Sequence, residues 1–177
     1  IDKSKLDKIF KGIKLFEHQD KFIDDCLWKA KLLDLKGYLL DAGPGEGKTI
    51  LSISLMEMLD IDTIIVICPK KAVNDVLDET ITRIYLEPQS YSMSMSIIHG
   101  PNKPAGFDIS NRFIVCHYES LGKLNEYLDT VKIPNKRYGI VLDEAHSMNS
   151  HNSERSIQFR ELNKKINPEF CLWMSGT

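Results

Sequence analysis

The sequence lacks an apolar run that approaches the roughly 20 residues of a membrane-spanning helix, so no membrane association is expected. It also lacks an apolar signal-peptide core and an initiating methionine, and we expect an excised or processed piece of an intracellular protein. An excess of positive charge is missing too, since 23 basic and 25 acidic residues give a formal net charge of -2. Any contact with nucleic acid must therefore come from local basic groups.

Cysteine is scarce, and its spacing excludes the usual paired motifs. The four cysteines form no CxxC pair. Three of them, Cys68, Cys116 and Cys171, stand in apolar stretches that predict buried strands, whereas Cys26 does not. We therefore expect core thiols in a reducing compartment, cytoplasmic or nuclear, rather than a disulfide or a zinc site.

Helical and strand patterns alternate along the 177 residues, a length typical of one domain. Helical spacing of apolar residues occurs in the first dozen residues and at residues 17–33, 48–59, 70–84, 119–128 and 153–166. Short apolar runs predict strands at residues 38–40, 63–68, 95–98, 113–116, 139–142 and 170–174. This alternation predicts an α/β fold, a mostly parallel sheet with helices on both faces, in which ligands bind beyond the carboxyl ends of the strands. Trp28 and Trp173 are expected in the core.

A glycine-rich segment, GPGEGKT, lies between a predicted strand and a predicted helix. Three glycines allow the backbone to curl so that its N–H groups point at phosphate oxygens: Gly43, Gly45 and Gly47. In such a loop Lys48 reaches the β- and γ-phosphates of ATP, and the Thr49 hydroxyl ligates Mg²⁺. The alternative is a glycine-rich turn with a chance GKT, which the strand–loop–helix context disfavours.

Two residues in or beside this segment are unusual for a phosphate-binding loop. Ala42 stands where that pattern has glycine, and the form AxxGxGKT resembles the helicase branch of P-loop proteins. Glu46 adds a carboxylate beside a loop that binds anions, so we expect its side chain to point outward. The string GEGKT also occurs in the preprotein-translocase ATPase.

Two carboxylates follow the apolar strand at residues 139–142. The strand delivers Asp143 to the sheet edge, where it can hold Mg²⁺ through coordinated water. Glu144 is then placed to orient and deprotonate the attacking water. A solvated turn is the alternative, and the accompanying phosphate loop disfavours it.

The string DEAH at residues 143–146 resembles motif II of superfamily 2 helicases, and other motifs of that superfamily occur in order over nearly the whole chain. Residues 15–19 resemble the Q motif, residues 66–70 motif Ia and residues 175–177 motif III. The resemblance implies a first RecA-like lobe at residues 15–177, with residues 1–14 as a flanking helix.

The resemblance also implies roles for single residues. Gln19 would bind the adenine edge, because an amide can both donate and accept hydrogen bonds. His146, Ser175 and Thr177 would couple the nucleotide site to nucleic-acid contacts.

Within the superfamily, residues 117–121 (HYESL) resemble the TSYE segment of Swi/Snf-type translocases of double-stranded DNA. Four further residues resemble that group's KNxxS…L pattern: Asn149, Ser153, Arg155 and Leu162. The match departs where Met148 replaces a lysine and where GEGKT replaces GLGKT.

Three residues are candidates for nucleic-acid contact. Lys70 and Lys71 follow motif Ia, which in the family grips the phosphate backbone, and His117 ends an apolar run at the same sheet edge. The alternatives are two solvated lysines and a structural histidine.

Together these features predict an enzyme that hydrolyses ATP with Mg²⁺ to move on or remodel nucleic acid. Duplex DNA is the favoured track, RNA stays open, and we expect a monomer. In this superfamily a second RecA-like lobe supplies a transition-state arginine. The chain ends after motif III, so we expect that lobe to be missing and the isolated chain to hydrolyse ATP poorly.

Other classes of function stay open. One is a nucleotide-controlled binding module that does not translocate, and another is the motor lobe of a restriction-type nuclease. A second lobe with an arginine motif would indicate a motor, and a nuclease carboxylate cluster outside this segment would indicate the restriction type. A motor on polypeptide is disfavoured by DEAH.

Overall fold

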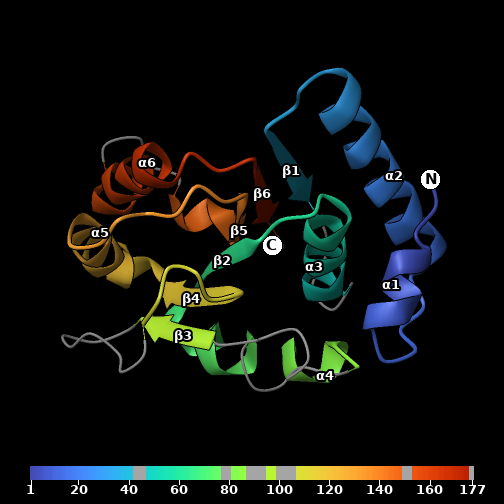
Figure 1. Cartoon of the computed structure of the whole chain (residues 1–177), viewed down its shortest axis with the longest axis horizontal. Coiled ribbons are helices and arrows are strands. Elements are labelled where there is room, and N and C mark those ends of the chain that lie inside the picture. Colours follow the sequence, from blue (N-terminus) through green and yellow to red (C-terminus); the bar gives the residue numbers. More distant parts are fainter. Residues whose placement is uncertain (42–46, 77–80, 87–94, 99–106, 149–152, 176–177) are drawn as a thin grey trace.

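The computed structural model describes residues 1–41, 47–76, 81–86, 95–98, 107–148 and 153–175. Six parallel strands form one sheet in the order β1-β6-β5-β2-β4-β3 (Figure 1). Their bounds are β1 Gly37–Asp41, β2 Thr63–Cys68, β3 Met95–Ile98, β4 Phe113–His117, β5 Tyr138–Leu142 and β6 Phe170–Ser175. The predicted parallel α/β sheet is confirmed.

Helices cover both faces of this sheet. The α-helices are α1 Ser4–Ile9, α2 Glu17–Leu32, α3 Lys48–Met58, α4 Thr82–Ile84, α5 Leu121–Asp129 and α6 Glu154–Ile166. Short 3-10 helices span Lys70–Ala72, Tyr118–Ser120 and Ala145–Met148. Helices α1, α2 and α3 lie on one side of the sheet, and α5 and α6 lie on the other (Figure 1). None of the described helices is long and apolar enough to cross a membrane.

Strand β2 shows why two cores form. Every residue of the strand is buried, because successive side chains point to opposite faces and both faces are covered. Ile64 and Val66 belong to the core beneath α1–α3, whereas Ile65 and Ile67 belong to the core beneath α5 and α6. A continuous β-branched run therefore fits a central strand of a parallel sheet.

The carboxyl ends of β1, β6 and β5 meet at one edge of the sheet. Strand β6 lies between the other two, and the register pairs Asp41 with Ser175 and Leu142 with Trp173. The segments that follow β1 and β5 therefore leave the sheet at the same edge, on either side of β6. This is the edge where parallel α/β sheets bind ligands.

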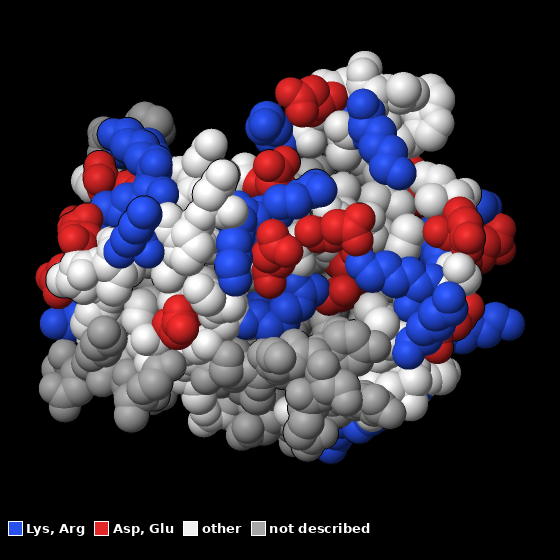
Figure 2. All heavy atoms as spheres, viewed as in Figure 1, with Lys and Arg blue, Asp and Glu red and all other residues white. Residues whose placement is uncertain are grey.

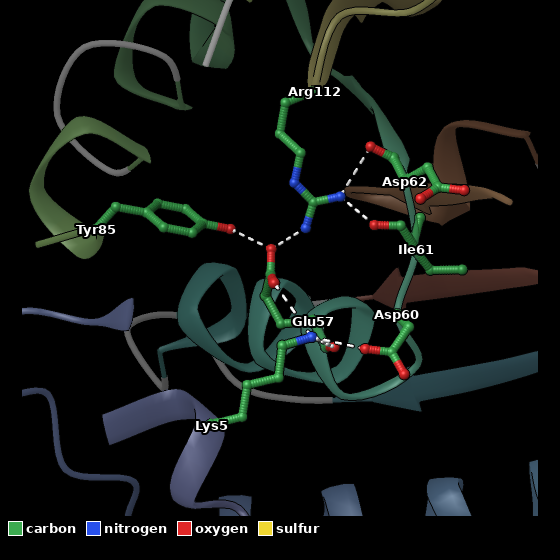
Figure 3. Close-up of polar contacts among 7 residues, drawn as sticks. All are labelled: Lys5, Glu57, Asp60, Ile61, Asp62, Tyr85 and Arg112. Carbon is green, nitrogen blue, oxygen red and sulfur yellow. Dashed lines mark hydrogen bonds and ion pairs between the residues drawn. The ribbon is translucent and has the colours of Figure 1, made fainter. Parts of the chain in front are cut away.

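The opposite, amino-terminal side of the sheet contains a polar cluster around Glu57 of α3 (Figure 3). The Glu57 carboxylate is 9% exposed, accepts a hydrogen bond from the Tyr85 hydroxyl at 2.8 Å and pairs with Arg112. Arg112 also donates to the carbonyl of Asp62 at 2.9 Å, and the Lys5 ammonium donates to the carbonyl of Glu57 at 2.7 Å. These bonds join α1, α3 and the starts of β2 and β4.

The expectation that Trp28 lies in the core was wrong, and the helix expected at residues 70–84 was found only in part. Trp28 is 62% exposed, because it lies on the side of α2 opposite the buried Ile23 and Leu27. Trp173 is partly buried, as expected, and makes an edge-to-face contact with Phe159 of α6 at 5.3 Å between ring centroids. The helix predicted at residues 70–84 begins as a 3-10 turn and ends as α4, and residues 77–80 lie outside the described part.

All four cysteines are buried free thiols, as expected. Burial raises the pKa of Cys68 to about 12, so this thiol stays protonated at neutral pH. A protonated, buried thiol is a packing group rather than a nucleophile.

Candidate nucleotide-binding site

The end of the predicted phosphate loop is built around Gly47, which precedes α3. Its φ is +67°, in the left-handed region, and a Cβ atom at this position would lie 2.6 Å from Nε2 of Gln19. Only glycine fits both the conformation and the close approach. Lys48 and Thr49 then form the start of α3, whose first-turn N–H groups have no partner within the helix. Gly43 and Gly45 lie outside the described residues.

Gln19 lies beside this loop end although the two segments are far apart in the sequence. The side chain is 2% exposed, and its Oε1 accepts a hydrogen bond from the N–H of Phe16 at 2.9 Å. The amide therefore fixes the start of α2 and contacts the phosphate loop at the same time. Its role in binding adenine stays a prediction.

The predicted acidic motif has a defined backbone at the end of β5. The N–H of Asp143 donates to the carbonyl of Ile67 at 2.8 Å, and the Asp143 carbonyl accepts from the Tyr118 hydroxyl at 2.6 Å. Glu144 has a φ of +51°. A side-chain-bearing residue in this left-handed region costs about 1–3 kcal/mol, and such residues cluster at functional sites.

The two motifs converge at one small cavity, whose lining includes Thr49 of α3 and Asp143 beyond β5. Burial raises the pKa of the Asp143 carboxyl, and the nearby Lys48 ammonium acts in the opposite direction. The predicted loop lysine and motif II aspartate are therefore close enough to interact. A hydroxyl and a carboxylate are oxygen ligands of the kind that Mg²⁺ prefers, so these residues fit the expected Mg-ATP.

The partly buried carboxylate of Asp143 leads to a stability prediction. Because the folded chain keeps the Asp143 proton to a higher pH than the unfolded chain, stability is lost as pH rises from the ordinary pKa of 3.8 through the raised value. Asp143→Asn removes this cost at pH 7, because the amide has no charge to lose on burial. We expect a higher Tm at pH 7 in metal-free calorimetry, with the gain shrinking as pH falls through that window. A lower Tm for the variant at pH 7 would contradict the assignment.

Other predicted residues lie around the same edge. His146 is exposed in the 3-10 helix that follows Glu144, and Ser175 is the last residue of β6, paired with Asp41 of β1. Lys70 and Lys71 are both exposed where the chain leaves β2. Thr177 lies outside the described residues. The coupling and nucleic-acid roles of these residues stay predictions.

His117 has the contacts expected of a structural histidine. It is 6% exposed, with Nδ1 at 2.9 Å from Oε2 of Glu119 and Nε2 at 2.9 Å from Oγ of Ser120. A direct contact with nucleic acid would require the ring to leave both partners. That contact stays a prediction, and the observed hydrogen bonds agree with the alternative.

Basic and acidic side chains are interspersed on the face shown in Figure 2. The described atoms of that face therefore present no continuous basic surface, in keeping with the small net charge of -2.

Tyr118 is a residue to which the sequence assigned no role of its own. Its hydroxyl reaches the main chain of Asp143, and its ring lies under the guanidinium of Arg155 at 5.4 Å. The signal available in the sequence was the position of the HYESL segment at the end of a predicted strand, which the structure shows as β4. The contact itself joins residues 25 positions apart.

The architecture is that of a RecA-like, helicase-type domain, and comparison with known families assigns the chain to one of them. The chain belongs to the family described as Type III restriction enzyme, res subunit, whose model matches residues 12–177. Domains of this family are helicase-like and generally use ATP and Mg²⁺. No curated protein matches the sequence.

A solved structure with a similar fold is a nuclease-deletion mutant of the Type ISP restriction-modification enzyme LlaGI in complex with a DNA substrate mimic. The TM-score is 0.62 at 15% identity, over 93% of this chain and 18% of the LlaGI chain. At this identity the likeness shows the fold alone. The chain spans less than a fifth of that enzyme's length, which limits the comparison to one domain.

Proposed function

We propose that this chain is the ATP-binding lobe of a nucleic-acid-dependent ATPase that moves on or remodels duplex DNA. The observation that carries the proposal is the meeting of Lys48, Thr49 and Asp143 at the carboxyl edge of the sheet. Membership of the res-subunit family supports an ATP-driven motor of helicase type.

The chain's own residues divide the work of hydrolysis. Bound Mg-ATP supplies the phosphoanhydride bond and the cation that neutralises developing charge. Lys48 would offset negative charge on the phosphates, and Thr49 and Asp143 would hold the cation. Glu144 orients the attacking water and accepts its proton. The work of this site is positioning and electrostatics, since phosphoryl transfer needs little covalent chemistry from the protein.

A restriction-type motor is the second candidate, and the family match favours it over a remodeller of the Swi/Snf type. In that case the lobe would drive movement along DNA for a nuclease. The similarity of HYESL to the TSYE segment supports a duplex track in either case.

The proposal is tested by measuring ATP hydrolysis of the natural full-length protein with duplex DNA, single-stranded DNA and RNA in parallel. We expect the largest stimulation by duplex DNA. Stimulation by RNA alone would indicate that the motor acts on RNA. A rate of ATP hydrolysis unchanged by all three nucleic acids would contradict a nucleic-acid motor. ATP-dependent cleavage of the duplex in the same reactions would favour the restriction-type candidate.

A further inference from the structure

The main chain of Asp143 is held on both sides of its Cα atom, through its own N–H and through the carbonyl of the peptide that leads into Glu144. Strand β2 accepts the Asp143 N–H through the carbonyl of Ile67 at 2.8 Å. On the other side the Tyr118 hydroxyl donates to the Asp143 carbonyl at 2.6 Å. Because that carbonyl belongs to the peptide that leads into Glu144, its direction and the left-handed φ of Glu144 are set together.

Tyr118 is itself held in a fixed position. The residue is 2% exposed, and its hydroxyl donates to the Asp143 carbonyl at 2.6 Å. The Arg155 guanidinium lies over the ring at 5.4 Å and pairs with the Glu119 carboxylate. Glu119 also contacts His117 at 2.9 Å. The Tyr118 ring is therefore packed against Arg155, and its hydroxyl is bonded to the Asp143 carbonyl.

We propose that Tyr118 is a positioning residue for ATP hydrolysis, whose hydroxyl holds the Asp143 carbonyl and thereby directs the Glu144 carboxylate toward the attacking water. This inference rests on the proposed function. Left-handed conformations of residues with side chains persist only where the surroundings fix them. Without the hydroxyl, the peptide can rotate and Glu144 loses its direction.

The inference separates catalysis from nucleotide binding. Tyr118 bonds the main-chain carbonyl of Asp143 and not the carboxylate that would hold Mg²⁺, and none of its contacts described above involves α3, which contains Lys48 and Thr49. Tyr118→Phe should therefore lower kcat while leaving the KM for ATP nearly unchanged. A purely structural effect on the domain would change both quantities.

The chain offers a matched control in Tyr138. This tyrosine is also 2% exposed, and its hydroxyl donates to the main-chain carbonyl of Pro134 at 2.8 Å. It stands at the start of β5, whereas Asp143 follows the end of the same strand. Tyr138→Phe thus removes the same kind of partly buried hydrogen bond, but at the amino-terminal end of β5.

The experiment compares Tyr118→Phe and Tyr138→Phe in the full-length protein with duplex DNA and saturating ATP. We expect similar falls in Tm for both variants. General acid–base groups contribute about 10²–10⁴-fold to rate, so misdirecting Glu144 should lower kcat at least roughly tenfold in Tyr118→Phe alone. Equal kcat values for the two variants would overturn the inference.

A double variant tests whether Tyr118 acts through Glu144. Single-turnover rates are measured for Glu144→Gln with and without Tyr118→Phe. Residues that act as a unit are not additive, so we expect no further loss in the double variant. An additive loss would overturn the inference. If the wild type does not hydrolyse ATP, or Glu144→Gln keeps full turnover, the proposed function fails and the role of Tyr118 falls with it.

Discussion

Lys48→Ala and Glu144→Gln are each expected to remove ATP hydrolysis stimulated by nucleic acid, but through different steps. Lys48 begins α3, and its ammonium lies near the partly buried Asp143 carboxyl, where it would also meet phosphate charge. Its loss should weaken ATP binding and slow the chemical step. Glu144→Gln keeps the size of the side chain and loses only the proton acceptor, so it should keep ATP binding and lower kcat by about 10²–10⁴-fold.

The two variants are separated by measuring nucleotide affinity as well as turnover. A fluorescent ATP analogue should bind Glu144→Gln like the wild type and Lys48→Ala more weakly. Two residues outside the site supply charge-matched controls: Lys132→Ala at an exposed position in the loop before β5, and Glu161→Gln at a partly exposed position on α6. Both should keep wild-type turnover. Intact turnover in both site variants would show that the assignment of this edge as the ATP site is wrong.

The sequence was sufficient for those parts of the fold that depend on local pattern. The β-branched run of β2 predicted a strand covered on both faces, and its six residues are all buried. The GKT string after a strand and the carboxylates after another strand predicted a common edge, since the carboxyl ends of parallel strands meet there. Thr49 and Asp143 line one cavity at that edge.

What escaped prediction depends on contacts between distant segments. Trp28 was expected in the core because it lies in an apolar periodic segment, yet it falls on the outer side of α2 at 62% exposure. The hydroxyl of Tyr118 reaches Asp143 only because β4 and β5 both pair with β2, a result of strand order that no local pattern contains. The pairing of Glu57 with Arg112 spans 55 positions and is equally hidden.

Breaking the cluster around Glu57 should have the largest effect on stability. Arg112→Met removes the cation paired with a carboxylate that is 9% exposed, and an uncompensated buried charge of this kind costs about 3–5 kcal/mol. For a domain of this length each 1 kcal/mol lowers Tm by about 2–4 °C, so we expect a fall of roughly 10 °C in a thermal melt. The Lys5 ammonium, 3.8 Å from Oε2 of Glu57, limits the loss but cannot replace a direct pair.

A second substitution distinguishes a buried charge from a general packing defect. In the double variant Glu57→Gln, Arg112→Met, a neutral amide replaces the carboxylate and can still accept the hydrogen bond of the Tyr85 hydroxyl. Replacing a whole buried ion pair is often close to neutral, so we expect the double variant to regain much of the lost Tm. A double variant no more stable than Arg112→Met would indicate that Arg112 acts through packing and its bonds to the Ile61 and Asp62 carbonyls. Because the cluster lies on the side of the sheet away from Lys48 and Asp143, turnover measured well below the melting range should stay near the wild-type value in both variants.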